Sequence, residues 1–169
     1  MYPTDTIWGI GCDATNPVAV DKIFGLKQRT AAKSMIVLIA DPRDINKYTS
    51  LPQPYIAEYL EKATKPTTVI YEAALGLATN LVSEDGSIAM RIVNEDFCRH
   101  LIKRLHKPLV STSANISGQD SPSNFAEISD EIKQGVDYIV QYRQQDGRLF
   151  SASAIVRFNK SGDPTILRS

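Results

Sequence analysis

Residues 108–118 read PLVSTSANISG, an apolar run that ends abruptly in hydroxyl and amide side chains. Residues 108–112, which begin with this apolar run, are typical of a buried strand. In an open α/β sheet, ligands bind beyond the carboxyl ends of the strands, and Ser113 and Asn115 stand at such a position. A Ser- and Asn-rich turn leading into a surface loop gives the same pattern, so both interpretations stay open for this segment.

Short apolar runs alternate with helix-like segments along the rest of the chain. This alternation predicts an α/β fold with a central, twisted, mixed sheet. The predicted strands are residues 35–39, 67–71, 87–92, 108–112, 138–141, 153–158 and 165–167. The predicted helices are residues 17–28, 54–63, 95–105 and 125–134, with Asn94 and Asn124 as N-caps and Gly135 just past the last helix.

The composition excludes several classes of protein. The 169 residues suit one domain, and 19 Lys+Arg balance 19 Asp+Glu, so a nucleic-acid contact would need a local basic patch. The two cysteines, Cys12 and Cys98, cannot form a disulfide framework, which favours a reducing compartment. No apolar run approaches the about 20 residues of a spanning helix, and no signal peptide is evident. We therefore expect a cytoplasmic protein without a membrane partner.

Motifs for a metal site, a glycine-rich phosphate loop or a dinucleotide fingerprint are not evident, but two further segments gather polar residues. Residues 2–14 read YPTDTIWGIGCDA, which fits a tight turn around a packed Trp8 or a loop that meets a small polar ligand. Residues 27–34 place Lys27, Arg29 and Lys33 after a predicted helix. These cations could interact with the helix dipole, or they could clamp a polyphosphate.

In this order, the three segments resemble the YrdC-like family of L-threonylcarbamoyladenylate synthases, also called TsaC. The matching motifs cover the chain from end to end: residues 2–14, Lys27 with Arg29, and then PTT at 66–68, MRIV at 90–93, TSANISG at 112–118, SAIV at 153–156 and ILR at 166–168. Each motif alone is weak, but their shared order is specific. The resemblance implies one YrdC-like domain over residues 1–169, with helices flanking the sheet around a concave, positively charged cavity. It also implies that an N-terminal helix and part of the first strand are missing.

The resemblance also implies a reaction. Members of the family condense L-threonine, bicarbonate and ATP into threonylcarbamoyl-AMP and release pyrophosphate. Downstream threonylcarbamoyl transferase proteins then modify the adenosine beside the anticodon of certain tRNAs. Mg²⁺ would accompany ATP and bridge its phosphates. Double-stranded RNA or tRNA is a further partner that the resemblance suggests.

Nine residues receive roles from the resemblance. Lys27 and Arg29 would offset the triphosphate charge and act as the catalytic pair. Threonine or its carbamate would contact four residues: Thr4, Thr68, Arg91 and Ser113. The nucleotide would contact Lys27, Arg29, Ser113, Asn115, Ser153 and Arg168. Arg91 has a second interpretation, as a strand arginine paired with a neighbouring carboxylate.

The sequence departs from the family pattern in places that carry no assigned chemistry. Prolines of the pattern are replaced by Thr30, Ser34 and Val93, and residues 143–151 replace a glycine-rich loop that usually helps to cover the nucleotide. Three alternatives stay open. They are an RNA-binding module without synthase activity, a carbamoyl-handling domain like that of hydrogenase-maturation proteins, and an inactive paralogue.

Overall fold

A computed structural model describes residues 1–29, 35–50 and 53–169. In this part of the chain seven strands form one sheet in the order β1-β5-β2-β4-β3-β6-β7. The strands are β1 (Gly9–Ile10), β2 (Ile36–Ile39), β3 (Thr67–Tyr71), β4 (Ile88–Ile92), β5 (Leu109–Ser113), β6 (Ala154–Phe158) and β7 (Pro164–Arg168). The β2–β4 and β3–β6 pairs are parallel, whereas the other neighbours are antiparallel. The predicted α/β class with a mixed sheet is confirmed.

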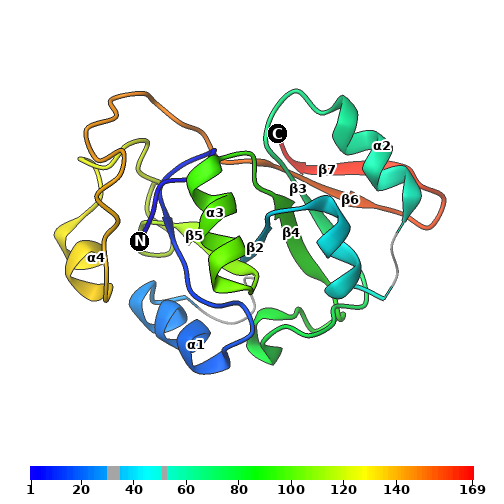
Figure 1. Ribbon diagram of the computed structural model, residues 1–169, viewed down its shortest axis with the longest axis horizontal. Coiled ribbons are helices and arrows are strands. Elements are labelled where there is room, and N and C mark those ends of the chain that lie inside the picture. Colours follow the sequence, from blue (N-terminus) through cyan, green and yellow to red (C-terminus); the bar gives the residue numbers. More distant parts are fainter. Residues whose placement is uncertain (30–34, 51–52) are drawn as a thin grey trace.

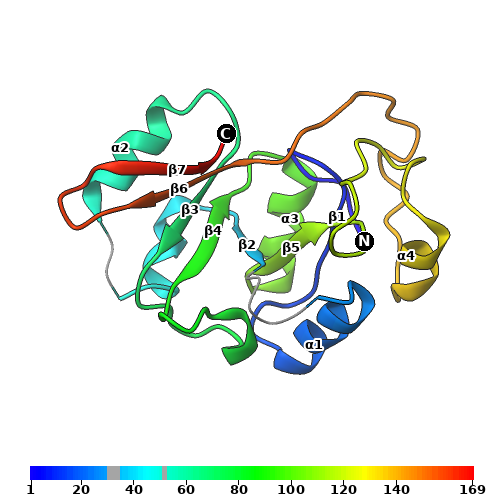
Figure 2. The same cartoon turned by 180° about the vertical axis from the view of Figure 1, so that it is seen from behind.

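Helices pack against both faces of the central strands. They are α1 (Pro17–Leu26), η1 (Pro42–Lys47), α2 (Pro54–Lys62), η2 (Thr79–Leu81), α3 (Asp96–Leu105) and α4 (Asp130–Gly135), η1 and η2 being 3₁₀ helices. Val37 lies in a cluster with residues of α1 and α2, whereas Leu38 lies in one with residues of α3. Figure 1 shows α2, α3 and η1 in front of the strands, with α1 below the sheet and α4 beyond its β1 end. In the reverse view the strands stand in front and these three helices lie behind them (Figure 2).

Apolar residues of the central strands explain why the sheet forms. Val37, Val69, Met90 and Val110 are almost completely buried between the covering elements. Burying side chains of this size contributes about 1.5–3 kcal/mol each relative to leaving them in water. A second buried cluster lies between α3 and the strands β2 and β5. Its residues are Tyr2, Leu38, Ala40, Val93, Cys98, Ile102 and Leu109.

The predicted strands agree with the structure except in two places. The prediction for residues 67–71 matches β3, and five others match a strand to within one residue at each end. The two-residue strand β1 was not predicted, because a short segment with a glycine lacks a strand pattern. The strand predicted at residues 138–141 is wrong: Val140 N donates to Met1 O at 3.0 Å, but this segment joins no ladder in the described residues.

The N-terminus of α3 lies one residue later than its predicted cap. Glu95 rather than Asn94 caps the helix, since its Oε2 accepts a hydrogen bond from Cys98 N at 2.8 Å. The backbone N–H of Asn94 donates instead to Asp5 Oδ2 at 3.0 Å. A contact distant in sequence therefore decides which of two capable residues becomes the cap.

The helix predicted at residues 125–134 forms only in its second half, as α4. Ser129 is the N-cap of α4, while Asn124 Oδ1 accepts from Glu127 N at 3.2 Å and caps a separate turn. Phe125 lies in this turn, where its ring packs 4.9 Å from that of Trp8. Gly135 is the last residue of α4 instead of following it.

Candidate active site

A cavity lined by residues of β1, β2, β4, β5, β6 and β7 brings together residues from near both ends of the sequence. It encloses about 620 Å³ of space between protein atoms, including its open mouth. Five of the nine predicted site residues line it: Arg29, Arg91, Ser113, Ser153 and Arg168. The other four, Thr4, Lys27, Thr68 and Asn115, are buried and are not part of the lining.

Lys27 follows α1 and is buried beneath the loop after β5, with only 1% of its surface exposed. Its Nζ donates hydrogen bonds to two backbone carbonyls, Ser113 O at 2.5 Å and Asn115 O at 2.6 Å. Burial, together with the nearby positive charge of Arg29, lowers the pKa of Lys27 to about 8. Lys27 thus fixes the loop that presents Ser113 to the cavity, and the ammonium group faces backbone oxygens.

Arg29 extends from the same segment to the cavity wall. Its Nη1 lies 3.5 Å from Thr112 Oγ1, and burial lowers its pKa. The hydroxyl contact is long, so it orients the guanidinium weakly. Lys33, which the sequence analysis grouped with Arg29, lies outside the described residues, as do Thr30 and Ser34.

Arg91, on β4, forms a buried ion pair at the cavity. Its Nη2 donates to Asp5 Oδ1 at 3.0 Å and to Thr6 Oγ1 at 3.2 Å. The side chains of Arg91 and Asp5 are only 3% and 8% exposed. Arg91 Nε is buried and has no hydrogen-bond partner in the described part of the protein. Both sequence interpretations of Arg91 therefore have support, because it pairs with a carboxylate and also lines the cavity.

Thr4 shapes the turn that carries Asp5 and Thr6. Its hydroxyl donates to Ile7 O at 2.8 Å and accepts from Thr6 N at 3.0 Å. The side chain is 1% exposed, so the turn uses its hydrogen-bonding capacity internally.

Thr68, Ser153 and Arg168 form a hydrogen-bonded group where β3, β6 and β7 are neighbours. The Thr68 and Ser153 hydroxyls lie 2.8 Å apart. Arg168 Nε donates to Ser153 O at 2.9 Å, and its Nη2 lies 3.3 Å from Ser153 Oγ. Burial, followed by the positive charge of Arg91, lowers the pKa of Arg168. Within this group only Thr68 does not line the cavity, and its hydroxyl orients that of Ser153.

Asn115 holds its own loop rather than lining the cavity. Its Nδ2 donates to Ile116 O at 3.0 Å and to Gln119 O at 2.7 Å. Its Oδ1 is buried without a hydrogen-bond partner among the described residues. Together with Lys27, it fixes the backbone that follows β5.

Sequence reasoning did not assign several lining residues, among them Thr6, Trp8, Ser111 and Ser121. Ser111 could have been found, since residues two apart on a strand share a face and Ser113 was already a candidate. Ser121 follows a loop with no periodic pattern, so no local signal indicates its position.

The described residues contain neither a cluster of metal-ligating side chains nor a membrane-spanning helix. No group of three or more His, Cys, Asp or Glu side chains there could hold a metal ion. No helix in residues 1–29, 35–50 and 53–169 is long and apolar enough to cross a membrane. Cys12 and Cys98 are free thiols, and burial raises the pKa of Cys12 to about 12.

Comparison with known proteins identifies the family. A model named for Sua5, YciO and YrdC, and described as "Telomere recombination", matches residues 1–169. The chain belongs to the Sua5/YciO/YrdC family. This result confirms the resemblance that the sequence motifs indicated. The positive potential of the cavity stays a prediction, although three arginines line it.

The relatives of this Sua5/YciO/YrdC chain include named enzymes. A threonylcarbamoyl-AMP synthase from Idiomarina loihiensis is 35% identical over 142 residues, which cover 82% of this chain and 76% of the relative. A double variant of P. abyssi Sua5 has a TM-score of 0.86 at 22% identity, covering 99% of this chain and 48% of that one. P. abyssi Sua5 complexed with L-threonine has a TM-score of 0.82 at 24% identity, with the same coverage of 99% and 48%. The two structures show the shared fold.

Proposed function

We propose that this protein is a threonylcarbamoyl-AMP synthase, a nucleotidyltransferase that condenses L-threonine, bicarbonate and ATP into threonylcarbamoyl-AMP and pyrophosphate. The observation that carries the proposal is the convergence of Arg29, Arg91 and Arg168 on one cavity with hydroxyl groups between them. The names of relatives at 35% and 31% identity support the same activity. A structure of P. abyssi Sua5 with L-threonine shows that ligand on a similar fold.

The proposed chemistry joins two anions. The threonine amine and bicarbonate give a carbamate and water, and a carbamate oxygen then attacks the α-phosphorus of ATP while the bond to pyrophosphate breaks. Because both reactants are negatively charged, guanidinium groups that offset this charge lower the barrier to their approach. We assign Arg91 to the threonine carboxylate or the carbamate, and Arg29 and Arg168 to the phosphates, since arginine binds both groups bidentately.

The remaining residues act in support of these contacts. The Ser113 and Ser153 hydroxyls, which line the cavity, would donate hydrogen bonds to the substrates. Lys27 would act by holding the loop after β5, because its Nζ already donates to two carbonyls there. This role differs from the direct phosphate contact that the resemblance implies.

Mg²⁺ remains part of the proposal as a companion of ATP. The described residues contain no cluster of three metal-ligating side chains, and the carboxylate of Asp5 is paired with the lining residue Arg91. Residues 1–29, 35–50 and 53–169 therefore offer no set of ligands for a protein-held ion. Mg²⁺ commonly relies on substrate phosphates and water, which agrees with this arrangement.

Pyrophosphate release tests the proposal. Protein incubated with threonine, bicarbonate, ATP and Mg²⁺ should release pyrophosphate only when threonine and bicarbonate are both present, and mass spectrometry should detect threonylcarbamoyl-AMP. Release that does not depend on threonine would contradict the assignment. Activity with carbamoyl phosphate in place of threonine and bicarbonate would instead favour the carbamoyl-handling alternative.

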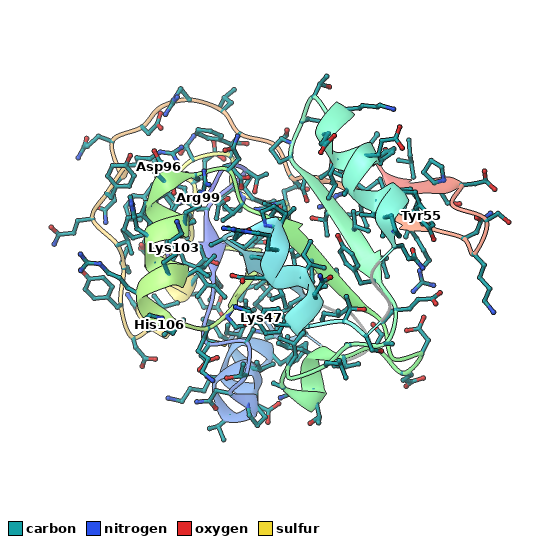
Figure 3. The ribbon with its side chains drawn as sticks, turned by 45° about the vertical axis from the view of Figure 1, so that its right-hand side comes forward. Lys47, Tyr55, Asp96, Arg99, Lys103 and His106 are labelled. Carbon is teal, nitrogen blue, oxygen red and sulfur yellow. The ribbon has the colours of Figure 1, made fainter. Side chains whose placement is uncertain are left out.

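The product would serve downstream transferases that modify tRNA, and we place the protein in the cytoplasm, where these substrates occur. RNA binding is a second candidate function, favoured by one feature of α3. Arg99, Lys103 and His106 lie along this helix, and no ion pair engages Lys103 in the described part of the chain (Figure 3).

A charge-matched comparison tests RNA binding. The triple variant K103Q/R104Q/K107Q removes Lys103 and two further exposed cations, Arg104 in the last turn of α3 and Lys107 just after it. It should weaken tRNA binding and reduce its salt dependence. The control K22Q/K65Q/K160Q removes the same charge at exposed lysines elsewhere. Equal RNA affinity of the two triple variants would reject α3 as the contact.

A further inference from the structure

A segment without regular structure runs from the end of α4 to the start of β6, and we call these residues, 136–153, the strap. Figure 1 shows it in orange, passing beside the blue N-terminal segment before it reaches β6. Backbone contact between the two is direct, because Val140 N donates to Met1 O at 3.0 Å. At its far end the strap supplies Ala152 and Ser153 to the cavity wall.

Arg143 is the residue through which the strap reaches the opening turn. Its Nη1 donates to Thr4 O at 3.1 Å, and its Nε donates to Asp146 Oδ2 at 3.1 Å. The guanidinium lies over the Phe150 ring, 4.9 Å from the ring centre, and 3.9 Å from Glu95 Oε1. Only 14% of this side chain is exposed. A planar guanidinium can donate hydrogen bonds from two of its edges while one face stacks on an aromatic ring, whereas the ammonium group of lysine cannot.

The backbone of Arg143 shows how closely the strap is constrained. Its φ is +63°, in the left-handed region that residues with a Cβ rarely adopt. Such a conformation persists where the surrounding contacts determine it. Here those contacts include a hydrogen bond from Phe150 N to Ser123 O at 3.3 Å, which ties the strap to a neighbouring loop.

The turn that Arg143 holds is the one that fixes Arg91. Thr4 O accepts from Arg143, the next residue is Asp5, whose carboxylate pairs with Arg91, and Thr6 Oγ1 accepts from Arg91. The contacts described above already fix the inner side of this turn. Arg143 supports it from the outside, so a movement of the strap would displace Asp5 and with it the Arg91 guanidinium.

We infer that Arg143 is a positioning residue for the anion site at Arg91: it holds the Thr4–Thr6 turn so that the Asp5-paired guanidinium faces the cavity. The inference rests on the proposed function, in which Arg91 binds the threonine carboxylate or the carbamate. It predicts a selective effect. Loss of Arg143 should weaken threonine binding and leave ATP binding nearly unchanged, because Arg29 belongs to a different segment and the Ser153 contact of Arg168 lies at the far end of the strap, where β6 begins.

The test compares Arg143→Met with Arg148→Met. Arg148 bonds to the same Asp146 and lies over the same Phe150 ring, but its side chain is 72% exposed, and no hydrogen bond or ion pair joins it to the opening turn in the described part of the chain. Initial rates of pyrophosphate release are measured against threonine and, separately, against ATP. We expect Arg143→Met to raise KM for threonine about tenfold, equivalent to about 1.4 kcal/mol of binding free energy, with KM for ATP within about twofold. Arg148→Met should stay within about twofold of the unaltered protein for both substrates.

A second variant and a direct binding measurement separate the role of Arg143 from a loss of folding or of activity. Arg143→Lys retains a donor for Thr4 O and should recover part of the threonine affinity. Calorimetric titration with threonine alone reports on the site even if no pyrophosphate is released, so a failure of the synthase proposal can be told from a failure of this one. Equal threonine affinity in Arg143→Met and Arg148→Met would overturn the inference. So would a loss in Arg143→Met that affects threonine and ATP equally, or unaltered protein that binds no threonine. If Arg143→Met does not fold, the comparison between Arg143→Lys and Arg148→Met decides in the same way.

Discussion

Replacing Lys27 by methionine tests whether a buried ammonium group holds the loop of the candidate site. Methionine keeps the length of the side chain but removes both hydrogen bonds, from Nζ to Ser113 O at 2.5 Å and to Asn115 O at 2.6 Å. A hydrogen bond from a charged donor contributes about 1.5–3 kcal/mol, and a buried acceptor left unpaired costs about 1–3 kcal/mol. The methionine variant no longer has the cost of burying a charged group, and this offsets part of the loss. We therefore expect a net destabilisation of about 3 kcal/mol.

The assay is thermal and urea unfolding followed by circular dichroism. For a chain of this length, 3 kcal/mol lowers Tm by roughly 6–12 °C. The control is Lys22→Met, at an exposed position on α1, the helix that precedes Lys27, which should change stability by less than about 0.5 kcal/mol. If Lys27→Met is as stable as Lys22→Met, the two carbonyl contacts do not hold the loop and the reasoning fails.

The pH dependence gives an independent check on the same group. The pKa of folded Lys27 is about 8, below its ordinary value of 10.5, so the unfolded chain binds more protons between these two values. The stability of the unaltered protein should therefore rise relative to Lys27→Met as pH increases from 8 toward 10.5, by at most about 1.4 kcal/mol per pH unit. Burial of Cys12 raises its pKa and acts in the opposite direction, but it is common to both proteins and cancels in the difference. A constant difference across this range would contradict the burial of Lys27.

Two further predictions concern packing and charge. Gly11→Ala should cost at least about 2 kcal/mol in urea unfolding, because the new Cβ would overlap the Val110 carbonyl oxygen, whereas Gly25→Ala meets open space within α1 and should raise Tm by about 2–4 °C. Similar stability of these two variants would show that the Gly11 contact relaxes. Asp5→Ala should cost about 3–5 kcal/mol, since it leaves a buried arginine unpaired, but Asp44→Ala removes an exposed pair and should cost less than about 1 kcal/mol. Equal losses in urea unfolding would refute that distinction.

Local pattern predicted the sheet well where burial is strong. Residues 67–71 are β-branched and apolar, they form β3 with the predicted bounds, and Val69 is 1% exposed. The pattern failed where pairing depends on a distant segment. Residues 138–141 look equally strand-like, yet their backbone contact is with Met1 instead of a strand of the sheet. Sequence periodicity gives the propensity of a segment but not the presence of a partner.

The sequence predicted which residues belong to the candidate site, but not which of them line the cavity and which are buried behind it. Arg29, Arg91 and Arg168 were assigned from motifs, and all three line the cavity. The same motifs placed Lys27 at a phosphate, but the fold buries it under a loop 86 residues later in the chain. A lysine after a helix looks the same in sequence whether it faces solvent or a pair of carbonyls. Arg143 had no assigned role, since its contact with Thr4 spans 139 residues.

The 139 residues between Thr4 and Arg143 also set an order of assembly during translation. At about 5–20 residues per second, the ribosome needs roughly 7–28 s to polymerise the chain from the opening turn to the strap that holds it. The pairing of β3 with β6 is delayed in the same way, because the contact between Thr68 and Ser153 spans 85 residues. A nascent chain that stops before residue 143 therefore exposes the edge of β3 and lacks the outer support of Asp5. The outer support of the anion site forms only when residue 143 has left the ribosome, so a product that ends before this residue should lack that support and be prone to aggregation.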